Sequence, residues 1–168
     1  MIVLGLTMGM QPIVGYNFGA QKMDRVKQTL RLGIISGVVI TSSGFVICEF
    51  FPHAVSALFT DSDELINLAV EGIRLAVLMF PFVGAQIVIG NFFQSIGKAK
   101  ISIFLSLTRQ LLYLLPCLLL FPQWWGLKGV WISMPVSDAL AFVTAVISLM
   151  IYIKKVSKEH PIANKVAE

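Results

Sequence analysis

The chain has 168 residues, of which 57% are hydrophobic and 13% are charged, and a formal net charge of +4. Together with a mean hydropathy of +0.83, this composition excludes an ordinary soluble domain and predicts an all-α, polytopic helical membrane protein. The basic residues lie between the apolar runs, where membrane topology accounts for them, so the positive charge does not indicate nucleic-acid binding. We expect a multi-pass protein of the plasma membrane, with the lipid bilayer as its surroundings.

Five apolar runs are long enough to be transmembrane helices, because about 20 residues at the rise of an α-helix cross the hydrocarbon core. They predict one transmembrane bundle over residues 1–153 and a cytoplasmic tail over residues 154–168. The expected spans are residues 1–20, 32–51, 75–97, 101–121 and 129–153.

The first span carries polar side chains and glycines in an otherwise apolar helix. Gln11 and Asn17 are candidates to face a transport path, and Pro12 predicts a break or kink near the membrane centre. Residues 22–31 hold four cations and are expected to form a cytoplasmic, amphipathic turn. Glycines four residues apart predict close helix packing. These pairs are Gly5 with Gly9, Gly15 with Gly19 and, in the second span, Gly33 with Gly37.

The central span, residues 75–97, contains no charged residue but three amide side chains, Gln86, Asn91 and Gln94. A lipid-facing surface has no use for such groups, so they are expected to face other helices or a water-filled cavity. Gln86 and Gln94 share one helix face. The stripe therefore predicts either a transport path or hydrogen-bonded packing between helices, and the pattern leaves both interpretations open.

Arg109 and Asp138 are the charged residues expected near the middle of the membrane, in the fourth and fifth spans. Because an unpaired charge at that depth is costly, we expect the two side chains to form an ion pair between neighbouring antiparallel helices. Two roles remain open. Asp138 could titrate or contact a cationic substrate or ion, with Arg109 modulating it, or the pair could be a permanent structural salt bridge.

The distribution of cations predicts the orientation of the bundle. Only Arg74 and Lys128 fall on the expected outer side, whereas ten cations fall on the expected cytoplasmic side, together with the C-terminus. Five spans then place the N-terminus outside, from which we expect further spans before Met1. The ten cations are Lys22, Arg25, Lys27, Arg31, Lys98, Lys100, Lys154, Lys155, Lys158 and Lys165.

A resemblance to a known family is specific at three segments. The run QPIVGYNFGAQK at residues 11–22 resembles the segment that closes the second helix of the C-terminal lobe in the multidrug and toxic compound extrusion (MATE) family. The likeness continues through residues 86–98 and 129–138 in the same order. It implies spans eight to twelve of a twelve-helix, two-lobe secondary antiporter that exports organic cations and drugs in exchange for protons or sodium. The missing N-terminal lobe would then be a partner of this chain.

One departure from that family concerns ion coupling. The sodium-coupled branch has a carboxylate in the helix matching residues 75–97, and the corresponding turn, residues 81–86, has none. The coupling ion, a proton or sodium, therefore stays open, and no other cofactor and no metal site is expected.

The sequence also bears on whether the chain is an enzyme or a protein that does not export drugs. No nucleophile with a base, no cluster of metal ligands and no phosphate-binding glycine loop is seen in the sequence, so we do not expect an enzyme. The alternatives to an antiporter are a non-transporting helical bundle, either a remnant or the partner of a split protein, and a lipid or polysaccharide flippase of the same superfamily.

Overall fold

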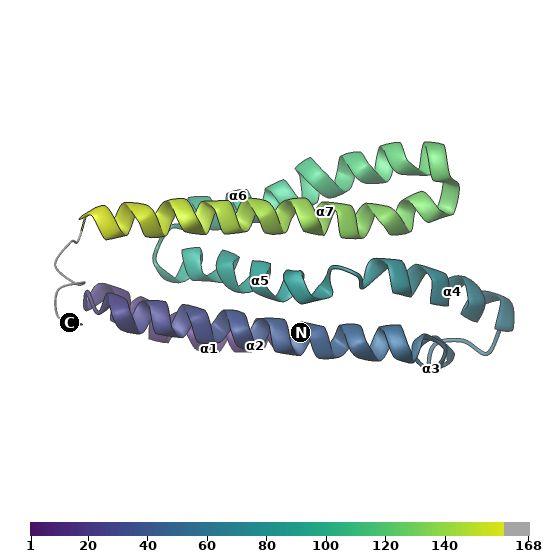
Figure 1. The fold of residues 1–168 in the computed structure, drawn as a ribbon, viewed down its shortest axis with the longest axis horizontal. Coiled ribbons are helices and arrows are strands. Elements are labelled where there is room, and N and C mark those ends of the chain that lie inside the picture. The colour runs from purple at the N-terminus through teal and green to yellow at the C-terminus, as the bar shows by residue number, and fades with distance from the viewer. Residues whose placement is uncertain (160–168) are drawn as a thin grey trace.

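The structure, a computed structural model, describes residues 1–159 of the chain, so the last nine residues of the expected tail lie outside it. The prediction of an all-α membrane protein is confirmed, because the described residues are helical with no strand. The elements are α1 (Ile2–Gly19), α2 (Met23–Phe50), α3 (Pro52–Ala57), α4 (Asp63–Ala76), α5 (Phe80–Ser95), α6 (Ala99–Leu107), the π-helix η1 (Thr108–Leu114) and α7 (Leu115–Glu159). Figure 1 shows the long helices lying alongside one another, with α5 between α2 and α7.

The first two helices are longer and less interrupted than expected. Helix α1 continues through Pro12 without a break. Helix α2 begins at Met23, so the basic segment at residues 22–31 is its first turns rather than a separate surface turn. No proline and no glycine lies between Met23 and Arg31. Helix formation can therefore extend to the basic end of the bundle, with the long cationic side chains reaching toward water.

The expected central span at residues 75–97 is divided. Helix α4 ends at Ala76 and α5 begins at Phe80, and the two helices are bent by 54° at this break. Pro81 lies in the first turn of α5, where its missing N–H costs no helical hydrogen bond. The polar stripe therefore lies entirely on α5.

The fourth and fifth spans form a hairpin whose turn lies at Gly126. Its backbone has φ 55° and ψ −135°, a conformation open to glycine, and α7 folds back on itself there (Figure 1). Helix α7 continues to Glu159, so the expected tail starts as helix. The stretch at residues 108–114 in the fourth span is π-helical, which the sequence pattern did not predict.

Length and composition identify candidate membrane spans among the described residues. Two stretches qualify, Met23–Phe50 and Ala99–Val156, and the bent pair α4 and α5 makes a third if it counts as one span. The stretch Ala99–Val156 contains both limbs of the hairpin. Helix α1 is not among the stretches that qualify by length and composition, although α2 and α5 pack against it.

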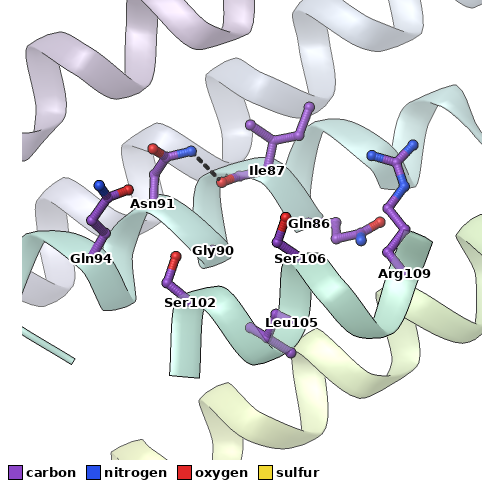
Figure 2. A pocket seen from close by; sticks show the side chains of 9 residues that line it. All are labelled: Gln86, Ile87, Gly90, Asn91, Gln94, Ser102, Leu105, Ser106 and Arg109. Atoms are coloured by element: carbon purple, nitrogen blue, oxygen red, sulfur yellow. Dashed lines mark hydrogen bonds between the residues drawn. The ribbon is translucent and has the colours of Figure 1, made fainter. Parts of the chain in front are cut away.

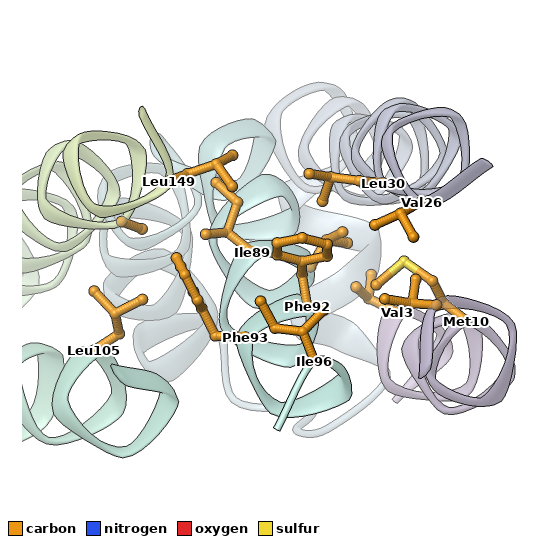
Figure 3. Close-up of a cluster of buried hydrophobic side chains, with 13 residues drawn as sticks. Val3, Met10, Val26, Leu30, Ile89, Phe92, Phe93, Ile96, Leu105 and Leu149 are labelled. Carbon is orange, nitrogen blue, oxygen red and sulfur yellow. The ribbon is translucent and has the colours of Figure 1, made fainter. Parts of the chain in front are cut away.

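The core of the bundle is built around α5. Figure 3 shows Phe92, Phe93 and Ile89 of α5 between apolar side chains of α1 and α2 on one side and of α6 and α7 on the other. All three side chains are at most 3% exposed. The rings of Phe92 and Phe93 also meet Tyr152 of α7 edge to face, at centroid distances of 6.2 and 5.6 Å. Helix α5 thereby joins the two sides of the bundle.

Some of the predicted glycine contacts are present. A side chain added at Gly37 of α2 would lie 3.1 Å from the backbone oxygen of Gly84 of α5, so these helices touch through their backbones. Gly33 likewise faces Met10 and Val88. The expected contacts at Gly5, Gly9 and Gly19 are absent among the described residues, because nothing lies within 4 Å of an added Cβ there.

Candidate functional site

A polar cavity of about 240 Å³ lies between α5 and the segment formed by α6 and η1 (Figure 2). One wall comes from α5 and the other from α6 and the first turn of η1. Most of the lining groups are amides, hydroxyls or a guanidinium, in a part of the molecule expected to be surrounded by lipid. The lining residues are Gln86, Ile87, Gly90, Asn91, Gln94, Ser102, Leu105, Ser106 and Arg109.

The α5 wall contains the three amides that the sequence singled out. Gln86 is 8% exposed, and its Oε1 has no hydrogen-bond partner among the described residues. Asn91 is held in place, because its Nδ2 donates to the backbone oxygen of Ile87 at 2.9 Å and its Oδ1 accepts from Nε2 of Gln11 at 3.2 Å. The wall thus contains a buried acceptor on Gln86 that the fold leaves without a partner, whereas the side chain of Gln94 is exposed.

The opposite wall contains two serines that the sequence analysis missed. Ser102 and Ser106 of α6 point toward α5 in Figure 2, and Arg109 continues the same side of the helix. A signal for them was present, because the three residues are spaced at i, i+4 and i+7 in an apolar span, as one polar helix face requires. Both walls of the cavity therefore carry polar side chains.

Arg109 is brought together with Asp138 of α7. The guanidinium donates to Oδ1 of Asp138 through Nε at 2.9 Å and approaches it through Nη2 at 2.8 Å. The Asp138 side chain is 9% exposed and the Arg109 side chain 38% exposed. The carboxylate therefore neutralises the guanidinium from the α7 side, and part of the Arg109 side chain stays exposed in the cavity.

The π-helix η1 carries Arg109. The backbone N–H of Leu115 bonds to the oxygen of Gln110, five residues earlier, which is the defining spacing of a π-turn. A second polar contact follows in the same segment, between the hydroxyls of Tyr113 and Thr144 at 2.8 Å. The irregular stretch is thus tied to α7 by two side-chain contacts.

The remaining candidates lie outside the lining. Asp138 contacts the cavity only through Arg109, and Gln11 only through Asn91. Asn17 is 7% exposed and donates to the backbone oxygen of Ile13 at 2.8 Å, without lining the cavity. The structure therefore brings Gln86, Asn91, Gln94 and Arg109 together directly and leaves Asn17 apart.

Curated relatives match this chain in sequence, and solved structures match it in fold. The multidrug export protein MepA of Staphylococcus aureus (strain MSSA476) is 24% identical over 157 residues, which cover 91% of this chain and 33% of MepA. A FAD transporter of Shewanella oneidensis is 23% identical over 143 residues, covering 83% of this chain and 31% of that protein. The chain therefore spans about a third of the length of these relatives.

The fold is that of transporters of known structure. The MATE multidrug transporter DinF-BH, solved in complex with a ligand, superimposes with a TM-score of 0.83 at 37% identity, over 88% of this chain and 33% of DinF-BH. The Vibrio cholerae MATE transporter VcmN in its bent form gives 0.83 at 19% identity, over 92% and 35% of the two chains. The family model MatE matches residues 1–119, more than half of the chain. The chain belongs to the multidrug and toxic compound extrusion (MATE) family, as the resemblance of its sequence segments implied.

Proposed function

We propose that this chain forms the C-terminal part of a secondary active multidrug efflux antiporter and that the cavity between α5 and α6 lies on its substrate path. The observation that supports this proposal is the cavity itself. Polar side chains line both of its walls, in helices that are expected to lie within the membrane. Polar groups at that depth face a solute path or a packing partner, and an open space between them favours the path.

Organic cations and drugs are the proposed substrates. MepA and DinF-BH are both named for multidrug export or transport, and DinF-BH was solved with a ligand bound. In this chain, the exposed side chain of Gln94 lines the cavity, and its amide oxygen can accept a hydrogen bond from an amine or ammonium group. Asp138 offsets the charge of Arg109, so the pair repels a cation in the cavity less than a lone arginine would.

The size of the cavity supports a binding site shared with a second lobe. Pockets that enclose a drug-sized molecule have about 300–1,000 Å³, and this cavity has about 240 Å³. A drug would therefore place one portion between α5 and α6 and require another surface for the rest. We propose the missing N-terminal lobe for that surface, with a proton or sodium ion as the coupling ion.

The test is efflux of ethidium, a fluorescent organic cation, from bacteria that lack their own pumps and express this chain with its adjoining coding sequence. Gln94→Leu removes a polar group from the cavity, and no hydrogen bond of the fold involves that side chain in the described structure. We expect it to slow efflux about tenfold, because a desolvated solute loses a polar contact. The matched control is Gln110→Leu, outside the lining, which is expected to leave the rate unchanged.

Equal efflux by the parent and the Gln94→Leu variant would remove the cavity from the substrate path. Vesicles loaded with ethidium then separate the coupling ions, because an imposed proton gradient and an imposed sodium gradient can each be applied alone. If neither form of the protein moves ethidium under either gradient, the non-transporting bundle is the better description.

A further inference from the structure

A second cavity, of about 310 Å³, lies at the basic end of the bundle between α2 and α7. Two cations of α2, Lys27 and Arg31, are at its rim, and its other lining residues are leucines and isoleucines of the two helices. It shares no residue with the polar cavity between α5 and α6. We call this second cavity the basic groove.

The order of residues along α2 separates the charged part of the basic groove from its apolar part. Lys27, Arg31 and Ile35 follow one another at i, i+4 and i+8, so they share one face of the helix. They extend over about 12 Å of the helix axis, with both cations toward the basic end. The floor is formed by Leu30 and Leu149, which are 6% and 9% exposed. The groove therefore leads from a cationic mouth along an aliphatic channel.

The two cations at the mouth are free to bind a ligand. Lys27 and Arg31 are exposed, and neither forms an ion pair with a side chain among residues 1–156, including Asp24 one turn earlier. By contrast, Arg74 and Lys128 at the other end are each paired with a glutamate. A desolvated anion would satisfy the donors that the fold leaves unused at Lys27 and Arg31.

We propose that the basic groove binds an anionic glycerophospholipid, with its phosphate between Lys27 and Arg31 and one acyl chain along the aliphatic channel. A phosphodiester accepts hydrogen bonds from both cations, and burial of an acyl chain against Leu30, Leu149 and Ile153 removes apolar surface from contact with water. The charge distribution predicts that this end faces the cytoplasm, and anionic lipids are enriched in that leaflet. A soluble anion would use the mouth and leave the channel empty.

The test compares phosphatidylglycerol with phosphatidylcholine of the same acyl chains, bound to the purified 168-residue chain in mild detergent and counted by native mass spectrometry. We expect the first bound lipid to be phosphatidylglycerol, with an affinity at least about tenfold higher, because each cation near a lipid surface contributes about 1 kcal/mol. Lys27→Gln combined with Arg31→Gln is expected to abolish the preference. The matched control is Lys22→Gln with Arg25→Gln, which removes two cations of the same segment outside the lining.

A second variant tests the apolar channel without changing charge. Ile35→Trp places a larger side chain in the lining and is expected to weaken binding of both lipids several-fold. If the double glutamine variant loses its helical circular dichroism and is therefore unfolded, Ile35→Trp still tests whether the channel binds lipid. Equal binding of the two lipids, or equal loss of preference in the control variant, would overturn the proposal. A lipid-free dimer that the double glutamine variant dissociates would assign the groove to a second copy of the chain and overturn it as well.

Discussion

Two regions of this bundle hold their helices together in different ways. Between α2 and α5, Gly37 faces Gly84 and the two backbones are in contact. Between η1 and α7, polar side chains make the contacts, an ion pair of Arg109 with Asp138 and a hydrogen bond of Tyr113 with Thr144. Lipid supplies little hydrophobic driving force between helices, so small residues and polar pairs are the two available devices.

The difference explains where the polar cavity lies. The glycine contact between α2 and α5 leaves no room for a solute, because Cβ atoms added at Gly37 or Gly84 would meet backbone. The ion pair of Arg109 with Asp138 holds a polar side chain beside the face of α5 that points toward α6. The polar cavity lies at this face. Helix α5 thus has a close-packed side toward α2 and a polar, open side toward α6.

The largest expected effect comes from breaking the polar region at Asp138. Asp138→Leu leaves the Arg109 guanidinium without its counter-ion at the expected depth of the membrane, and we expect a loss of about 3 kcal/mol in the free energy of unfolding. The value lies toward the low end for an orphaned buried charge because the Arg109 side chain is 38% exposed. A titration with sodium dodecyl sulfate, followed by the helical circular dichroism of the purified chain in detergent, measures the change.

The control for this prediction removes both charges. Arg109→Met combined with Asp138→Leu leaves no orphan, so most of the lost stability is expected to return. If the double variant is as unstable as Asp138→Leu alone, the carboxylate has a structural role other than neutralising Arg109. Efflux by the double variant then separates structure from transport, because a purely structural pair would be dispensable for the rate.

The second largest effect tests the glycine region. Gly84→Ala would place a Cβ against the backbone oxygen of Gly37 and 2.5 Å from Oγ1 of Thr41, so α2 and α5 must move apart. We expect a loss of about 1–3 kcal/mol, the usual cost of overpacking. Gly44→Ala on α2 is the control, because nothing lies within 4 Å of its added Cβ and a small gain from helix propensity is expected. Equal stability of the two variants would contradict the close contact between the helices.

A smaller effect is expected at the hydroxyl pair of Tyr113 and Thr144, whose oxygens are 2.8 Å apart. Polar contacts between membrane helices are worth about 0.6 kcal/mol on average. Tyr113→Phe, Thr144→Val and their combination form a double-mutant cycle in which we expect a coupling energy of that size. A coupling energy of zero would show that the contact adds nothing to the association of η1 with α7, and the ion pair would then be the main polar contact between them.

Much of this architecture could be predicted from the sequence, because in lipid the backbone must be satisfied within helices and polar groups must face inward. The amides of α5 and the residues Arg109 and Asp138 were identified on that ground alone. The positions of the helix ends were harder to predict. Lys27 and Arg31 lie in a segment that composition assigns to a loop, whereas α2 extends through it.

The missed features depend on contacts that a single sequence does not contain. Nothing in residues 108–114 signals a π-helix, since the extra residue in the turn is stabilised by partners on α7. Gly5 and Gly9 have the same spacing as Gly33 and Gly37, yet only the second pair faces another described helix. The spacing of small residues shows that close packing is feasible, and the neighbouring helix decides whether it occurs.

The smallest expected effect comes from an exposed ion pair on the expected outer side of the membrane, which can be compared with the pair of Arg109 and Asp138. Nζ of Lys128 lies 2.7 Å from Oε1 of Glu71, and both side chains are about half exposed or more. The hydrogen bond and the charge of Glu71 raise the pKa of Lys128 above its ordinary value of 10.5, against a smaller opposing effect of burial. Because a raised pKa means that the folded state holds the proton more tightly, the stabilisation is complete below pH 10.5 and is lost as the pH rises through the folded-state value.

We therefore expect Lys128→Met to lower the melting temperature of the purified chain only slightly at about pH 8, as is usual for an exposed ion pair. The difference between the parent and the variant is expected to stay constant up to about pH 10 and to shrink at higher pH. Glu71→Gln supplies the matched control, because it removes the same pair from the other partner. A difference that persists above the folded-state pKa would show that the lysine stem stabilises the α7 turn by packing rather than by its charge. In that case the Lys128 variants would not report on the strength of an exposed ion pair. The contribution of lipid to an ion pair would then have to be measured at Arg109 and Asp138.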